Sequence, residues 1–216
     1  MSSSTELGAE SSVERSPERL VFFSDAVVAI ALTLLVLPLA EAVPEAVSEH
    51  TNSIELITGN QWKIYSFLLS FAVIARLWIV HHRLFEQVKA YSYPLMVANH
   101  CWLLAIVVLP FPTEMIGGFR EDRFTASLYI ATVLASSVSL LVMTLIIRAD
   151  PDVAKHPGGV PDDQRFGTAV TTGILVVALA LAALVPGVGY FALLLLVLGN
   201  PIGRLRHRRR AAGTAA

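Results

Sequence analysis

The residues that could do chemistry in this sequence lie inside apolar segments. Ser24 and Asp25 stand near the start of the apolar stretch 22–40, FFSDAVVAIALTLLVLPLA, and His81 and His82 lie in a second one. A carboxylate within a membrane is costly, so an intramembrane ionisable group is a candidate for a functional role. Three roles are open for Asp25: contact with a permeating ion, relay of a proton, or hydrogen bonding between helices.

Neither enzyme chemistry nor a metal site is indicated. Metal ligands on one helix are usually three or four residues apart, whereas the adjacent His81 and His82 point about 100° apart. The sequence contains no G-x-S-x-G, no phosphate-binding glycine loop and no C-x-x-C, and its one cysteine, Cys101, lies in an apolar stretch. We therefore predict that the chain is not an enzyme and holds no metal or cofactor.

Composition predicts a membrane protein with several spans. Of the 216 residues, 55% are hydrophobic and 15% are charged, compared with about 25% charged in soluble domains. A hydrocarbon core needs roughly 20 helical residues to cross. We predict an all-α polytopic fold with a disordered tail (1–15), a transmembrane domain (16–203) and a basic tail (204–216). The six predicted transmembrane helices cover residues 16–39, 62–81, 94–109, 124–147, 166–185 and 188–202.

The distribution of Lys and Arg predicts the orientation. With six spans both ends of the chain lie on one side, and that side carries 12 of the 16 basic residues. Basic loops stay in the cytoplasm, so both termini are predicted to be cytoplasmic and the protein to lie in the cell (inner) membrane. The acidic segment 41–61 then faces outward and can form a short surface helix. The arginines of 204–210 are predicted to anchor to anionic lipids rather than to bind nucleic acid.

Helical geometry separates two surfaces of the first helix. Ile30, Leu34 and Leu37 form one apolar stripe with Thr33 on its flank, whereas Asp25 points about 140° away from Ile30. One surface can line a path or meet a partner, and the other must pack into the bundle of the same chain. Asp25 and Ile30 therefore cannot serve the same surface.

Depth in the membrane suggests partners for Asp25. The second helix returns antiparallel to the first, so its last turns, with Trp78 and His81, reach the depth of Asp25, as does Asn99 on the third helix. An indole N–H, an imidazole and an amide can each satisfy a buried carboxylate. We predict a structural hydrogen-bond network between helices, with a titrating proton relay as the alternative.

The motif Arg19-x-x-x-Phe23-Ser24-Asp25, followed by AVVAIALTLLVL, resembles the first-helix signature of the transmembrane protein 175 family, which are potassium-permeable channels of endolysosomes and bacteria. SFAVIARLWIVHHRLF (70–85) is similar to the second helix of that family. The match continues through Asn99 and LPFPT (109–113). Three segments agree in order and spacing, over about half the chain.

The resemblance implies a homotetramer of six-helix subunits in which the first helices line a central pore, with a constriction at Ile30 and a path continuing past Thr33, Leu34 and Leu37. It also implies that Arg19, Phe23, Ser24 and Asp25 pack against Trp78 and His81. The expected function is passive conduction by a potassium-permeable cation channel that needs no cofactor, only permeant potassium ions. The alternatives are a proton-coupled small transporter and a non-conducting structural membrane protein.

Overall fold

The computed structural model describes residues 17–119 and 122–184, and within these ranges the regular elements are all helices. They are α1 (Pro17–Leu34), α2 (Leu37–Ser48), α3 (Ser53–Gly59), α4 (Gln61–Phe85), α5 (Tyr93–Val108), α6 (Pro110–Gly118), α7 (Arg123–Ala149) and α8 (Asp162–Leu184). The predicted all-α fold is confirmed. The sixth predicted span, 188–202, and both predicted tails lie outside the described residues.

Five segments in the described part of the chain are long and apolar enough to cross a membrane. They are Pro17–Ser48, Gln61–Phe85, Tyr93–Gly118, Arg123–Ala149 and Asp162–Leu184. They correspond in order to the first five predicted spans, so the multi-pass membrane class is confirmed for this part.

The first predicted helix ends earlier than expected. It was predicted to run to residue 39, but α1 ends at Leu34 and a two-residue turn separates it from α2. A continuous helix would need an N–H at position 38 to bond the carbonyl of Leu34, and Pro38 has none. Proline is tolerated in the first turn of a helix, so Pro38 sits at the start of α2 instead. The segment 41–61 is accordingly mostly helical, in α2 and α3.

A second proline-containing segment also begins a helix where the sequence suggested an end. The third span was predicted to stop at residue 109 before Pro110 and Pro112. In the structure α5 stops at Val108, and α6 starts directly at Pro110. The two prolines lie in its first turn, where their missing N–H groups are not required. This helix brings Gly117 against α4, where a Cβ atom would lie only 3.3 Å from the Cα of Lys63.

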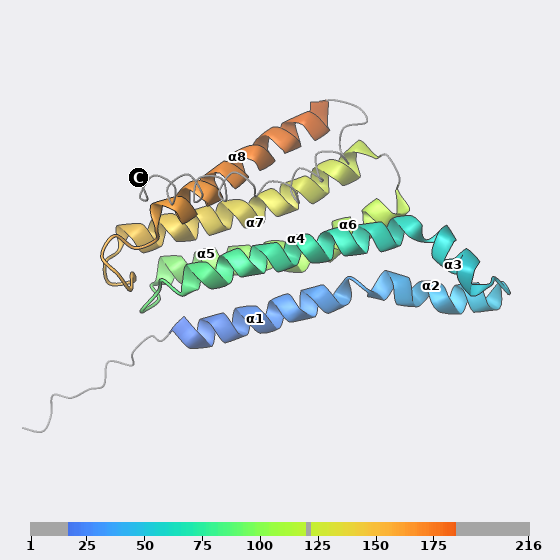
Figure 1. Cartoon of the computed structure of the whole chain (residues 1–216), viewed down its shortest axis with the longest axis horizontal. Coiled ribbons are helices and arrows are strands. Elements are labelled where there is room, and N and C mark those ends of the chain that lie inside the picture. Colours follow the sequence, from blue (N-terminus) through green and yellow to red (C-terminus); the bar gives the residue numbers. More distant parts are fainter. Residues whose placement is uncertain (1–16, 120–121, 185–216) are drawn as a thin grey trace, which may run out of the picture.

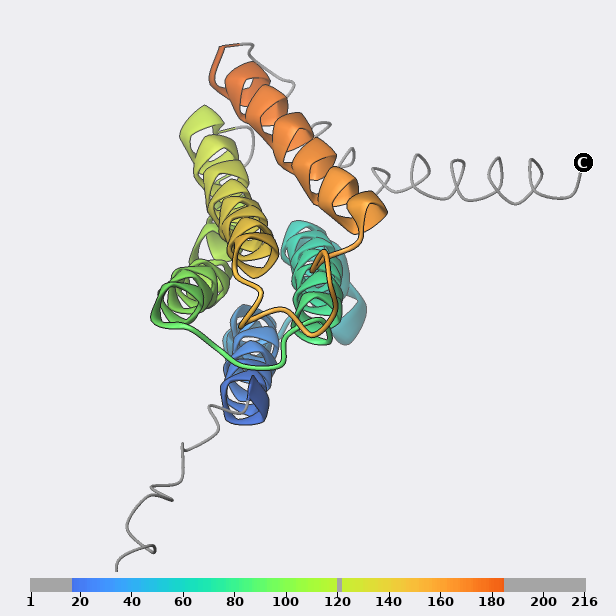
Figure 2. The same cartoon turned by 90° about the vertical axis from the view of Figure 1, so that its left-hand side faces the viewer.

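The helices are arranged in a layered bundle. Seen end-on, α1 lies against the pair α4 and α5, α7 covers the opposite side of that pair, and α8 packs on the outside of α7 (Figures 1 and 2). Helices α1 and α8 therefore lie at opposite edges of the bundle. Each leaves much of its surface without a neighbour within the described part of the subunit.

A short connection ties the loops at one end of the bundle together. The N–H of Lys89 donates to the carbonyl of Val153 over 2.9 Å, and the N–H of Lys155 donates to the carbonyl of Gln87 over 2.8 Å. Arg148 forms an ion pair with Asp162 over 2.8 Å. The two backbone bonds join the α4–α5 loop to the α7–α8 loop, and the ion pair joins the end of α7 to the start of α8.

Candidate functional site

Helix α1 has one face that packs into the bundle and one that does not. Its buried positions, together with the first residue of the following turn, recur every three or four residues: Leu20, Ser24, Val28, Ala31 and Leu35. This spacing defines a single stripe of a helix, and the stripe faces α4 and α5. The other side of α1 is available for a surface outside the described subunit.

A buried chain of hydrogen bonds joins α1, α5 and α4. The hydroxyl of Ser24 donates to the carbonyl of Leu20 over 2.8 Å, and Nδ2 of Asn99 donates to Oγ of Ser24 over 2.9 Å. Nε2 of His81 lies 2.7 Å from Oδ1 of Asn99. A carbonyl oxygen can only accept, so His81 carries a proton on Nε2. The bonds run in one direction, from His81 through Asn99 and Ser24 to the backbone.

Asp25 has a different partner from Ser24. The indole Nε1–H of Trp78 donates to Oδ1 of Asp25 over 2.7 Å, and Asp25 is half-buried. The sequence offered an indole, an imidazole and an amide as partners for this carboxylate. The structure assigns it the indole, and the imidazole and amide belong to the hydrogen bonds that run through Ser24 to the carbonyl of Leu20. The structure therefore joins α1 to its neighbours by two separate contacts.

Trp102 packs against His81, and this contact was not predicted from the sequence. The two rings are stacked, with centroids 4.0 Å apart and planes 11° apart, and both side chains are fully buried. The ring of Phe85 lies 4.5 Å from His81 on the same helix. Trp102 follows Asn99 by three residues, so the two share one face of α5. That spacing is the signal that could have identified it.

Two residues of the first-helix motif lie outside this buried network. Arg19 is exposed near the start of α1. Phe23 is also exposed, and its ring lies 6.2 Å from that of His100 on α5. The resemblance implied that both pack against Trp78 and His81, but the described subunit does not bring them there.

The predicted stripe lies on the face of α1 that the subunit leaves uncovered. Ile30 is 59% exposed, Leu34 is 44% exposed and Leu37 is 49% exposed. Thr33 is exposed too, and its hydroxyl donates to the carbonyl of Ile30 over 2.7 Å. The proton of Thr33 is thus engaged, while its oxygen keeps acceptor capacity toward the uncovered side. Leu37 belongs to α2, beyond the turn that ends α1. Its direction relative to Ile30 therefore cannot be calculated from one continuous ideal helix.

The arrangement offers oxygen and apolar groups rather than a metal centre. Among the described residues, no group of three or more His, Cys, Asp or Glu side chains could hold a metal ion. Asp25 of α1 and His81 of α4 are turned toward the bundle, and the uncovered face of α1 carries isoleucine, leucine and threonine. A surface of this kind can narrow a path or contact another helix.

The residues that form this geometry lie in a part of the chain that matches a known protein family. The family described as endosomal/lysosomal potassium channel TMEM175 matches residues 19–110, which contain both the buried network and the uncovered stripe. A potassium channel of Streptomyces collinus is 35% identical over 133 residues, covering 61% of this chain and 59% of the relative. An endosomal/lysosomal proton channel TMEM175 of Danio rerio is 26% identical over 62% of this chain and 25% of its own length.

A solved structure resembles the whole bundle. It is described as a lysosomal potassium-selective channel TMEM175 homolog from Chamaesiphon minutus. The TM-score is 0.72 at 26% sequence identity, and the match covers 88% of this chain and 96% of the other. The similarity in fold therefore extends beyond the residues that the family comparison matches.

Proposed function

We propose that the chain belongs to the TMEM175 channel family and is a potassium-permeable cation channel that conducts passively through a hydrophobic constriction. Four copies would surround a central pore with their α1 helices. The bacterial relative and the solved structure named above are both called potassium channels. The chain spans about 60% of the length of that relative, so conduction by this chain is a proposal that requires its own test.

The division of α1 into two faces carries the proposal. Its polar side chains Ser24 and Asp25 are bound to α5 and α4, so they are engaged inside the subunit and hold the helix in place. The stripe that includes Ile30 lies on the opposite, uncovered side. A pore between copies would therefore be lined by this stripe.

The stripe suits a constriction that opens and closes by wetting. Rings of Ile30, Leu34 and Leu37 would exclude water when the helices are close, and hydrophobic constrictions gate by such dewetting. The oxygen of Thr33 would replace part of the hydration shell of a passing ion, since pore-lining dipoles can do so. No resident cofactor is needed for this, and potassium is the permeant ion.

The surroundings of the channel follow from the charge distribution. We place it in the inner membrane with both termini in the cytoplasm, because basic residues collect on that side. The basic tail 204–216 would contact anionic lipid headgroups, and no nucleic-acid partner is proposed. The acidic α2 and α3 would then lie at the outer end of the pore.

Proton permeation is the second candidate. The relative from Danio rerio is named a proton channel, and Asp25 and His81 are protonatable groups at the contacts of α4 with α1 and α5. A proton-coupled transporter would instead need a titratable group facing a water-filled cavity. Asp25 bonded to Trp78 and His81 buried under Trp102 do not favour that alternative.

Flux into liposomes tests the proposal. Purified full-length protein is reconstituted in potassium-loaded liposomes, and potassium and proton movement are followed separately with dyes under imposed gradients. We expect potassium flux that depends on protein and on the gradient. Absence of any cation flux under every gradient would overturn the channel proposal and leave a structural role. Proton flux without potassium flux would favour the second candidate.

A further inference from the structure

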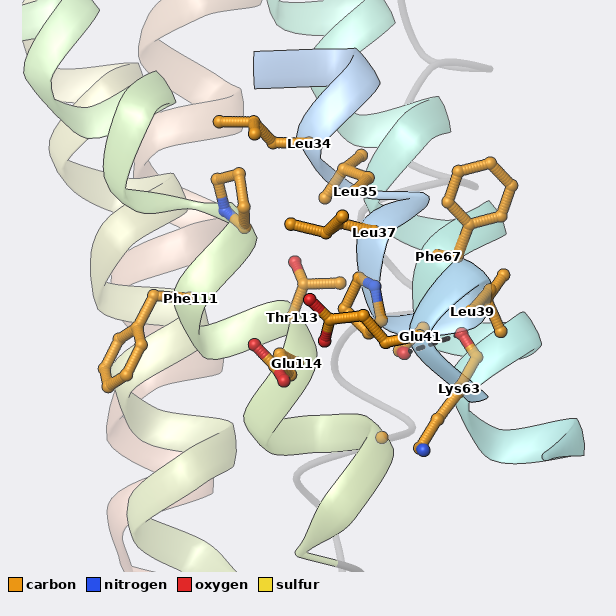
Figure 3. Close-up of a pocket in the computed structure, with 14 residues that line it drawn as sticks. Leu34, Leu35, Leu37, Leu39, Glu41, Lys63, Phe67, Phe111, Thr113 and Glu114 are labelled. Carbon is orange, nitrogen blue, oxygen red and sulfur yellow. Dashed lines mark hydrogen bonds between the residues drawn. The ribbon is translucent and has the colours of Figure 1, made fainter. Parts of the chain in front are cut away.

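A pocket of about 270 Å³ lies beside the turn that joins α1 to α2. Its walls come from this turn, from the first turns of α4 and from α6 (Figure 3). Most of the lining is apolar and includes Leu34, Leu37, Phe67 and Phe111. Binding sites for small molecules are concave and mostly apolar, with a few polar groups that converge on the ligand. This pocket has that composition.

The polar groups in the pocket carry an excess of negative charge. Glu41 of α2 and Glu114 of α6 come from different walls, and their carboxylates are turned toward the same space (Figure 3). The ammonium group of Lys63 is directed away from that space. Among the described residues, neither glutamate forms an ion pair. A cation placed between two carboxylates that face one space is attracted to both.

The geometry points to a binding site for a small organic ammonium ion with an apolar body. The ammonium group would lie between Glu41 and Glu114 and donate to both carboxylates, and the body would lie against Phe67, Phe111 and the leucines. A hydrated divalent ion can bind two carboxylates, but it would leave the apolar walls of this pocket without a partner. These walls favour a ligand that carries carbon.

A ligand in the pocket would affect conduction, an effect that rests on the proposed channel function. Leu34 and Leu37 line the pocket and also belong to the uncovered stripe proposed to line the pore. They lie on either side of the turn at residues 35–36. A ligand wedged beside them would hold α1 and α2 at one angle. It would therefore slow any gating movement of the stripe.

Binding is tested directly with n-hexylammonium as the probe. Calorimetric titration of the purified full-length protein should show saturable binding, at least about tenfold tighter than that of the neutral analogue n-hexanol. Glu41→Gln and Glu114→Gln should each weaken binding about tenfold or more, because each removes one charged acceptor. Glu45→Gln is the matched control, since Glu45 is an exposed carboxylate of α2 that does not line the pocket.

Several results would overturn the inference. One is that n-hexylammonium shows no saturable binding to wild type, and another is that n-hexanol binds as tightly as n-hexylammonium. A third is that both pocket variants bind n-hexylammonium as tightly as wild type does, and a fourth is that Glu45→Gln weakens binding as much as they do. Both glutamates are exposed, so the variants should fold, and their thermal unfolding is measured alongside. In the flux assay n-hexylammonium should slow potassium flux of wild type and spare Glu114→Gln. Saturable binding to a protein that passes no ions would leave the site standing and reject the channel.

Discussion

The indole N–H of Trp78 donates to Oδ1 of Asp25 over 2.7 Å, across the interface between α4 and α1. This contact gives the half-buried carboxylate a partner in its own subunit, on a side of α1 that Ile30 does not share. The charge therefore orients the helix, and the uncharged stripe is left for contacts beyond the subunit.

Trp78→Phe should destabilise the protein and leave conduction per folded channel unchanged. The substitution keeps an aromatic ring but removes the indole N–H and some side-chain volume. Asp25 therefore loses its partner at a cost of about 1–2 kcal/mol, in addition to a smaller loss of packing. Thermal unfolding in detergent measures the loss, and liposome flux normalised to assembled protein measures conduction. Normal stability combined with lost ion coupling would favour a transporter.

Ile30→Asn should raise potassium flux severalfold or weaken discrimination against sodium. An amide at the narrowest point would keep water in the path, whereas isoleucine excludes it. Val177→Asn on α8 is a matched control, because Val177 has the same exposed fraction, 59%, on the opposite edge of the bundle. If Val177→Asn changed potassium flux or sodium discrimination as much as Ile30→Asn does, Ile30 would not be the constriction of the ion path.

Thr33→Val should lower potassium selectivity with little change in stability. Valine has nearly the shape of threonine and lacks the oxygen that would replace water around a passing ion. The hydroxyl of Thr33 is exposed and bonds only the carbonyl of Ile30 among the described residues, so the change in the free energy of unfolding should stay within about 0.5 kcal/mol. Bi-ionic flux ratios of potassium and sodium provide the measurement. Unchanged ratios would exclude Thr33 from ion contact.

Asp122 should stabilise α7 in a pH-dependent way. Its carboxylate accepts from the hydroxyl and the N–H of Thr125 at the start of the helix, over 2.7 Å and 2.9 Å. These bonds lower the pKa of Asp122 below its ordinary value. A lowered folded pKa means that the stabilisation is complete above the ordinary carboxyl pKa of about 3.9 and is lost as pH falls through the folded value.

Asp122→Ala should therefore lower the unfolding temperature at neutral pH, and the difference from wild type should shrink in acid. Asp122→Asn is the control, because asparagine also caps helices but does not titrate. A pH-independent difference between wild type and Asp122→Ala would contradict the role of the ionised carboxylate.

Local patterns in the sequence were sufficient for the membrane class, the first five spans and the two faces of α1. Hydropathy and helical periodicity are properties of neighbouring residues, so Ile30 and Asp25 could be assigned to different surfaces without knowing any contact. The same patterns could not decide whether each proline ends one helix or begins the next. Pro38 and Pro110 were expected near helix ends, but each lies in the first turn of a new helix.

Only the tertiary structure decided which polar groups meet. Asp25 pairs with Trp78 and Ser24 with Asn99 because α4 and α5 lie at particular rotations and depths beside α1. A shift of one residue in either helix would turn these side chains by about 100°, and no pattern within a single helix encodes that register. The pocket between Glu41 and Glu114 likewise exists because the turn after α1 and the start of α6 place two distant segments side by side.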